Sequence, residues 1–134
     1  MPGNPPMPMT KHNEQTGVVR LRTRPQFLFV RAGKSERRKT LVVQARRRPG
    51  NSPYIGEGFT ATKKVGNAVI RNRSKRRLRA ASQALLPRLG LPNYDYVFIA
   101  RMETATIGWT RLLDDMESAL ISLADTFQTG AGHA

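Results

Sequence analysis

Apolar residues recur along the chain in short runs that predict three strands. Residues 40–46 and 94–101 are rich in β-branched and aromatic side chains, which favour extended structure. A third strand runs from Tyr54 or Glu57 to Thr62, where large and small side chains alternate as in a half-buried strand. The segment 47–53 carries prolines and a glycine, so it is predicted to be a loop between the strand at 40–46 and the strand that ends at Thr62.

Three further segments show helical spacing. Residues 25–33 predict a short helix, since Pro25 suits a first turn and Gly33 can close the last one. A central helix is predicted to start after Asn67 as its cap and to end between Pro87 and Gly90. In a last helix, capped by Thr110, one stripe is apolar and consists of Leu112, Leu113, Met116, Leu120 and Leu123.

The order helix, strand, strand, helix, strand, helix predicts a compact α+β domain with a small sheet. The strands on either side of the central helix are expected to be parallel, and the default crossover between parallel strands is right-handed. The predicted domain covers residues 19–127. Residues 1–18 are rich in Pro, Gly, Asn and Met without periodicity and predict a disordered tail, and residues 128–134 predict a second one.

Charge narrows the possible partners. The chain has 23 Lys and Arg against nine Asp and Glu, a formal net charge of +14, and a pI of about 11.5. Such a chain favours a polyanionic partner, with nucleic acid ahead of an acidic membrane surface. No apolar run approaches the about 18 residues of a membrane span, and the first residues lack the apolar core of a signal peptide. We therefore expect a soluble intracellular protein.

The composition also excludes several kinds of chemistry. The chain has no cysteine, which removes disulfides, thiolate zinc sites and cysteine nucleophiles. Its two histidines, His12 and His133, lie in the predicted tails. Acid–base catalysis by a histidine pair needs rigid placement, so a ribonuclease of that kind is not expected.

The central helix concentrates positive charge. At about 100° per residue, one side holds Ile70, Ser74, Leu78, Ala81 and Leu85 and can cover a sheet. Asn72, Lys75, Arg76 and Arg79 are predicted to point the opposite way, and Arg71, Arg73 and Arg77 lie at the flanks. No acidic residue occurs between Glu57 and Asp95, so nothing in this segment neutralises the charge. A solvated basic face is the ordinary alternative, but the strongly basic surroundings favour a phosphate-binding surface.

Two lysines, Lys63 and Lys64, precede the helix, and Gly66 follows them. Backbone N–H groups at a helix start, with a glycine that permits close approach, form a natural anion site. The spacing is not that of a Walker phosphate loop.

The stretch KKVGNAVIRNRSKRRLR, residues 63–79, resembles the signature of the bacterial ribonuclease P protein family, with an Arg-Asn-Arg core at 71–73. The resemblance covers roughly residues 20–125 and includes Phe27 in the short helix, the strand at 41–45 and the strand at 95–101. The sequence departs from the family pattern at Ala80, where many members carry an acidic or amide residue. It departs also at Phe29, which lies closer to Phe27 than the family's second aromatic does. Whether Phe29 belongs to the core or to a binding surface stays open.

The resemblance implies an α+β fold of the ribonuclease P protein-like (ribosomal protein S5 domain 2-like) type, a small mixed β-sheet packed with helices. It also implies a left-handed β-α-β crossover around the motif helix, against the right-handed default, and we adopt the left-handed expectation. The implied function is that of a subunit of a cytoplasmic endoribonuclease that removes the 5′ leader of precursor tRNA. The catalytic RNA of ribonuclease P would perform the cleavage with Mg²⁺ that it mainly holds itself. The resemblance implies no catalytic residue and no metal ligand in this chain, and it implies no protein partner.

Two RNA-binding surfaces follow from the resemblance. The first, on the motif helix and the turn before it, consists of Lys63, Lys64, Asn67, Arg71, Asn72, Arg73, Lys75, Arg76 and Arg79. The second is a cleft for the single-stranded 5′ leader, lined by Phe27, Val42, Gln44, Thr60 and Thr62. The alternation of side chains along a strand is compatible with this cleft, because Val42 and Gln44 share one face of their strand and Thr60 and Thr62 share one face of theirs. Periodicity alone favours Phe27 in the core, whereas the resemblance favours a base-stacking role; Phe59 and Phe98 are assigned to the core.

Two other functions would fit a basic α+β protein. A ribosomal or RNA-chaperone-like structural protein would share the charge and the fold without a special cleft. A metal-dependent nuclease would need clustered acidic ligands. The only such cluster, Asp114, Asp115 and Glu117, has helical spacing that is typical of a solvated face.

Overall fold

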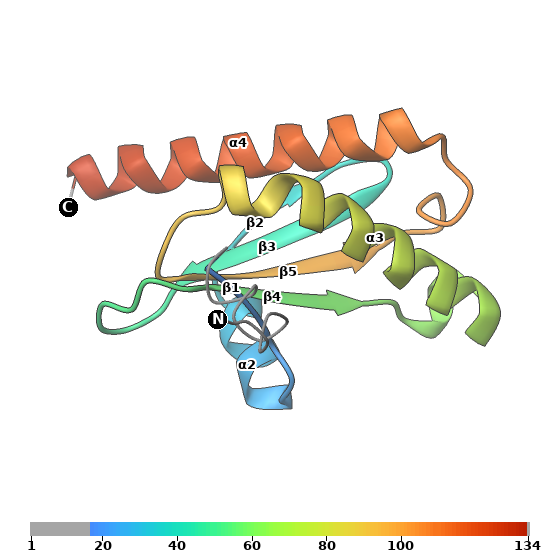
Figure 1. Ribbon diagram of the computed structural model, residues 1–134, viewed down its shortest axis with the longest axis horizontal. Helices are drawn as coiled ribbons and strands as arrows, with labels where there is room; N and C mark the ends of the chain where they lie inside the picture. The colour runs from blue at the N-terminus through green and yellow to red at the C-terminus, as the bar shows by residue number, and fades with distance from the viewer. Residues whose placement is uncertain (1–16, 134) are drawn as a thin grey trace, which may run out of the picture.

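The computed structural model describes residues 17–133, with side chains through residue 129. It contains one five-stranded sheet in the order β1-β4-β5-β3-β2 (Figure 1). The strands are β1 (Val18–Arg20), β2 (Lys34–Arg37), β3 (Leu41–Arg47), β4 (Ile55–Thr60) and β5 (Tyr94–Ala100). β4 is parallel to both β1 and β5, whereas β3 is antiparallel to β5 and β2. The mixed α+β fold expected from the sequence is confirmed.

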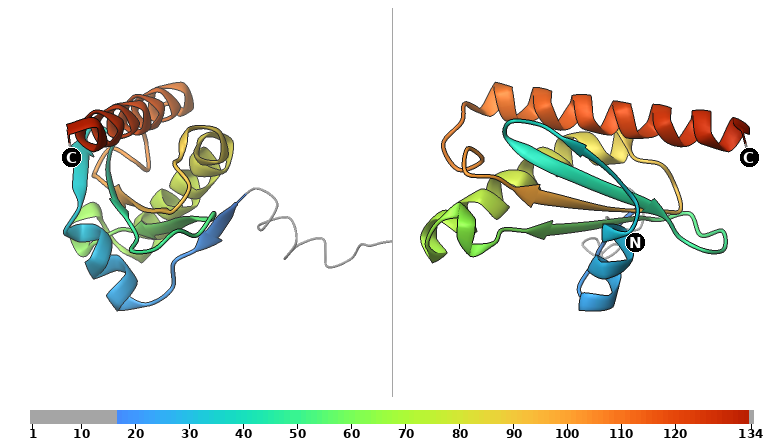
Figure 2. Two further views of the ribbon diagram at one scale, coloured as in Figure 1. Left: turned by 90° about the vertical axis from the view of Figure 1, so that its left-hand side faces the viewer. Right: turned by 180° about the vertical axis from the view of Figure 1, so that it is seen from behind.

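The helices divide between the two faces of the sheet. α3 (Ala68–Leu89) and α4 (Trp109–His133) cover one face, and the short α2 (Arg24–Arg31) lies under the other (Figures 1 and 2). A 3₁₀ turn, η1 (Lys63–Val65), connects β4 to α3. The large core lies between the sheet and the two long helices and includes Leu41, Val43, Phe98, Leu78 and Leu120. α2 packs over a smaller cluster formed by Leu21, Val30 and Val97.

The crossover β4–α3–β5 is left-handed. β4 and β5 are adjacent and parallel, and α3 lies on the same face as α4 (Figure 2). A right-handed crossover between these two strands would place α3 on the opposite face, where α2 and Leu21 already pack. The right-handed default is therefore wrong for this chain, and the expectation taken from the family resemblance is confirmed.

The predicted phases of the long helices are also confirmed. In α3, Ser74, Leu78, Ala81 and Leu85 are buried, and in α4 Leu112, Met116, Leu120 and Leu123 are fully buried. Asn67 caps α3, since the Ile70 N–H donates to Asn67 Oδ1 at 3.0 Å. In the core beneath the start of β5, burial raises the pKa of Tyr96 to about 12, and its hydroxyl oxygen accepts a hydrogen bond from the Leu91 N–H.

Several predicted boundaries need correction. Val18 pairs in β1, although residues up to 18 were predicted to be disordered; the predictions for residues 1–16 and 134 lie outside the described residues. β2 was not predicted at all, because its sequence Lys-Ser-Glu-Arg has no apolar residue. α4 starts at Trp109, so Thr110 is not its cap, and it continues past Gln128 to His133 instead of fraying there. Among the described helices, none is long and apolar enough to cross a membrane.

Asp115 on α4 connects that helix to the turn before β3. Its carboxylate accepts hydrogen bonds from the Thr40 hydroxyl at 2.9 Å, from the Thr40 N–H at 3.3 Å and from Arg111 Nε at 3.1 Å. Partial burial opposes ionisation, but these hydrogen bonds together with the Arg111 charge hold the pKa of Asp115 below its usual value. The ionised form of Asp115 therefore stabilises the folded state.

Replacing Asp115 by Asn should lower the free energy of unfolding at pH 7 by about 1 kcal/mol, because a charge-assisted hydrogen bond becomes a neutral one. A carboxyl whose folded pKa is depressed contributes stability above its unfolded pKa of about 3.9 and loses it as the pH falls through the lower folded value. Urea unfolding of both proteins should thus show a gap at pH 7 that narrows below about pH 4. Asp114→Asn, at an exposed position, is the matched control. A gap of the same size at low pH would contradict the assignment.

Candidate nucleic-acid interface

The turn before α3 is fixed by Gly66 and Arg71. Gly66 has a φ of 149°, a conformation that favours glycine, and a Cβ there would lie 2.9 Å from Ile70 Cγ2. Arg71 is half-buried, and its Nη1 donates to the Gly66 carbonyl at 2.9 Å. Arg71 therefore stabilises the turn as well as adding charge beside it.

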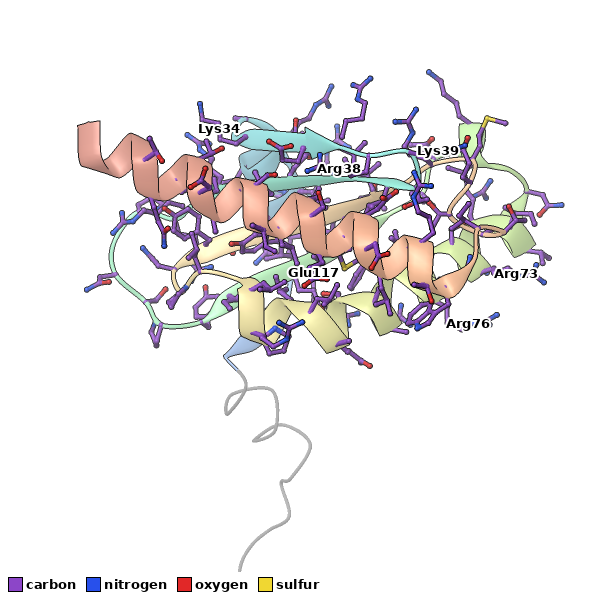
Figure 3. The ribbon with its side chains drawn as sticks, turned by 90° about the horizontal axis from the view of Figure 1, so that it is seen from above. Lys34, Arg38, Lys39, Arg73, Arg76 and Glu117 are labelled. Atoms are coloured by element: carbon purple, nitrogen blue, oxygen red, sulfur yellow. The ribbon has the colours of Figure 1, made fainter. Side chains whose placement is uncertain are left out.

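Most residues of the predicted helix surface are accessible. The exposed ones are Lys63, Lys64, Asn67, Asn72, Arg73 and Arg76, and the half-buried ones are Arg71, Lys75 and Arg79. Figure 3 shows Arg73 and Arg76 projecting outward from α3. Neither side chain has a hydrogen-bond or ion-pair partner among the described residues. Both guanidinium groups are thus available for phosphate.

Lys75 and Arg79 take a different direction from the one predicted. They line a cavity of about 280 Å³, here called the Phe27 groove. Its lining is Arg20, Leu21, Arg22, Phe27, Phe59, Lys75 and Arg79. The helical wheel had placed Lys75 and Arg79 directly away from the sheet, but both line a cavity together with Phe27 of α2 and Phe59 of β4. Of the predicted leader cleft, only Phe27 lines this groove, and Val42, Gln44, Thr60 and Thr62 do not. The two predicted surfaces therefore meet there at Phe27 alone.

Phe59 joins the core to this groove. Its ring stacks on Phe98 with centroids 5.6 Å apart, which agrees with its core assignment. The guanidinium carbons of Arg20 and Arg79 lie 5.1 Å and 5.9 Å from the centroid of the same ring. Arg79 Nε is buried and has no hydrogen-bond partner among the described residues. The groove thus has an aromatic wall with two guanidinium groups beside it.

Phe27 lies against the sheet at Gly58. A Cβ at Gly58 would be only 2.7 Å from Phe27 Cε2, so the glycine gives the ring its place on the strand. Phe27 is half-buried, packing beside the small cluster under α2 while it also lines the groove. The core and the binding alternatives for Phe27 are therefore compatible.

The register places the other predicted cleft residues on the face of α2. Thr60 pairs with Ile99, and Ile99 with Val42, while Gln44 pairs with Val97 one row away. Val42, Gln44 and Thr60 are all half-buried. Thr62 does not belong to this row, because β4 ends at Thr60 and Thr62 is an exposed residue before η1. Strand parity therefore fails for Thr62.

Sequence reasoning missed the contribution of Arg20 and Arg22, which only the basic segment around them could have indicated. Arg20 is oriented by Glu57, which is 5% exposed. Glu57 accepts hydrogen bonds from Ser82 Oγ at 2.6 Å and from Arg20 Nε at 3.4 Å. A buried carboxylate between β4 and α3 thus holds one cation at the groove.

Arg77 has a structural role within the fold. Its two terminal nitrogens donate to the carbonyl oxygens of Thr104 and Ile107. These bonds attach α3 to the segment that leads into α4. Arg77 therefore differs from the exposed Arg73 and Arg76 in its contacts, although all three belong to the same charged run.

The acidic residues do not form a metal centre in the described part of the chain. No group of three or more His, Cys, Asp or Glu side chains comes together there. Asp115 is engaged by Thr40 and Arg111, and Asp114 is exposed.

A basic α+β fold with a cationic, aromatic-walled groove defines a protein of the RNA-binding class. The sequence profile described as Ribonuclease P matches residues 17–124. The chain belongs to the ribonuclease P protein family. It is 50% identical over 111 residues to the ribonuclease P protein component of Caulobacter vibrioides, covering 83% of this chain and 74% of that one. The corresponding protein of Ruegeria pomeroyi is 46% identical over 110 residues, covering 81% of this chain and 88% of that one.

Solved structures of RNase P proteins share the fold of this chain. The RNase P protein from Thermotoga maritima aligns with a TM-score of 0.64 at 25% identity, covering 78% of this chain and 96% of that one. A Staphylococcus aureus RNase P protein mutant with defective mRNA degradation activity aligns with a TM-score of 0.70 at 22% identity. That alignment covers 90% of this chain and 98% of the other. The shared architecture is thus that of RNase P proteins.

Proposed function

We propose that this chain is the protein subunit of a cytoplasmic ribonuclease P, binding both the RNase P RNA and the 5′ leader of precursor tRNA. The observation that carries the proposal is the Phe27 groove, where Lys75 and Arg79 of the motif helix lie beside Phe27. Family membership supplies the RNA partner. The leader is the single-stranded part of the substrate, and a groove of cations and aromatic rings suits a single strand.

The two parts of the surface would divide the work. Arg73 and Arg76 extend outward, where they can reach the backbone phosphates of a folded RNA. A-form RNA hides its base edges in a deep groove, so these contacts would read shape and charge. In the Phe27 groove, Arg20, Lys75 and Arg79 would neutralise leader phosphates while Phe27 stacks on a base without demanding its identity.

Catalysis would reside in the RNA. Mg²⁺ held mainly by that RNA would supply the chemistry that activates water for phosphodiester hydrolysis. The described residues offer no carboxylate cluster for this ion, so the role of the chain is to bind, orient and neutralise. Positioning of this kind lowers a barrier without any protein side chain touching the reacting atoms.

Adding the full chain to the RNase P RNA of the same organism should accelerate cleavage of precursor tRNA at least tenfold, or about 1.4 kcal/mol. The assay is run at a Mg²⁺ concentration at which the RNA alone cleaves slowly, because the protein then replaces part of the missing cation charge. An unrelated protein of similar charge is the control. Equal stimulation by both, or none by this chain, would favour the ribosomal or RNA-chaperone-like alternative.

A further inference from the structure

A second cavity lies on the other flank of α2. It has a volume of about 380 Å³, within the usual range for a small-molecule site. It is lined by Leu21, Pro25, Gln26, Phe29, Arg48, Pro49, Tyr54 and Asp95 and is called here the Tyr54 pocket. Only Leu21 is shared with the Phe27 groove. The pocket is thus a separate feature that the leader-binding proposal does not use.

The walls of the Tyr54 pocket combine aromatic rings with arginines. The guanidinium carbon of Arg48 lies 3.8 Å from the centroid of the Tyr54 ring, and that of Arg46 lies 4.3 Å from the centroid of Phe29. Arg48 is held in place, since it donates to Ser52 Oγ at 2.9 Å and to the Tyr94 carbonyl at 3.2 Å. Two rings whose positions are set in this way, with Pro25 and Pro49 beside them, suit a flat ligand.

The polar group of the pocket is Asp95. Its side chain is 6% exposed, and one oxygen, Oδ1, accepts a hydrogen bond from Arg48 Nη1 at 2.5 Å. Among the described residues, the other oxygen, Oδ2, accepts no hydrogen bond. A carboxylate oxygen on the pocket wall can accept a hydrogen bond from a donor on a ligand. The pocket therefore favours a flat ligand that carries an N–H group.

Positive charge around the pocket identifies the class of that ligand. Arg47 is exposed beside Arg48, and Arg22 and Arg24 are exposed beside the α2 residues of the lining. Cations around an aromatic pocket suit a nucleotide, whose base can stack on an aromatic ring while its phosphate lies outside.

We propose that the Tyr54 pocket binds one unstacked nucleobase that carries an exocyclic amino group, from a single-stranded part of an RNA partner. Adenine, cytosine and guanine can donate an exocyclic amino N–H to Asp95 Oδ2. Uracil has only its ring N3–H as a donor, and the two carbonyl oxygens that flank it are repelled by a carboxylate. The inference rests on the proposed function only in taking RNA as the partner. It assigns a base preference to a place where the proposed function has none.

The test titrates the ¹⁵N-labelled full chain with AMP, CMP, GMP, UMP and, as a probe without a base, ribose 5-phosphate. The backbone signals of Ser52 and Gly56 and the side-chain amide signal of Gln26 report on the pocket. We expect AMP, CMP and GMP to shift these signals, UMP to bind at least about fivefold more weakly, and ribose 5-phosphate to leave them unchanged. Tyr54→Ala should raise the Kd for CMP at least about fivefold, and Tyr54→Phe, which keeps the ring, should restore it.

Asp95→Asn should abolish the preference of CMP over UMP, since an amide can donate to the uracil carbonyl. If Asp95→Asn does not fold because Arg48 loses its carboxylate partner, the two Tyr54 variants still test the proposal. Equal binding of UMP and CMP, or shifts confined to the Phe27 groove, would overturn the proposal. The measurement contains no RNase P RNA, so its failure would leave the stimulation of cleavage by the protein intact, and the reverse also holds.

Discussion

The Arg71→Ala, Arg73→Ala double variant should bind the RNase P RNA roughly a hundredfold more weakly, a loss of about 3 kcal/mol for two charge-assisted contacts. Arg73 is exposed and Arg71 lies at the helix start, where anion binding is favourable. Each phosphate contact contributes about one unit to the slope of log K against log salt. The slope for the double variant should thus be less steep by about one to two.

The matched control for charge is the Lys34→Ala, Arg88→Ala double variant. It removes the same net charge, but Lys34 lies far from Arg73 and Arg76 (Figure 3), and Arg88 is in the last turn of α3. Its salt slope should stay close to that of the unmodified protein. Arg73→Ala alone separates binding from the structural bond between Arg71 and Gly66, and should give about half the change. Equal slopes for the two double variants would show that net charge, and not the motif helix, determines RNA binding.

The long helices could be predicted because their sequences repeat the same signal over many turns. Leu78, Ala81 and Leu85 in α3 and Met116, Leu120 and Leu123 in α4 are all buried as expected. β1 and β2 could not be predicted, since both are short edge strands. β2 has no apolar residue and depends on its pairing with β3. β1 has only three residues, which pair with β4, and its Val18 packs against the large core. The handedness of the crossover depends on which face α3 occupies, a long-range property that local geometry does not determine.

The candidate site was predictable in composition but not in arrangement. A helical wheel gives the angle of Lys75 or Arg79 around the axis of α3, but not the position of α2 beside that helix. Gly58 shows the same limit. The sequence shows that Gly58 has no side chain. It does not show that the ring of Phe27, from the distant helix α2, occupies the space. Arg77 looked equivalent to its charged neighbours until its carbonyl partners in the segment before α4 were known.

Phe27→Ala should weaken binding of precursor tRNA to the assembled ribonucleoprotein by about 1–3 kcal/mol, the value of one base stacked on an aromatic ring. Mature tRNA has no leader to place in the Phe27 groove, so its affinity should change little. The measurement is the ratio of the two dissociation constants, determined in the same buffer. Phe27→Tyr keeps the ring and should keep the ratio. Equal losses for precursor and mature tRNA would make Phe27 a structural residue only.

Gly58 offers a way to move the Phe27 ring without removing it. The Cβ of Gly58→Ala would lie 2.7 Å from Phe27 Cε2, so the ring must shift away from the strand. We expect this variant to lower the precursor-to-mature preference as well, because stacking requires the ring at one position. In the Phe27→Ala background the added methyl group meets no ring, and the effect of Gly58→Ala should largely vanish. Such non-additivity is the mark of two residues in contact, whereas additive effects would mean that Phe27 does not act from its position on Gly58.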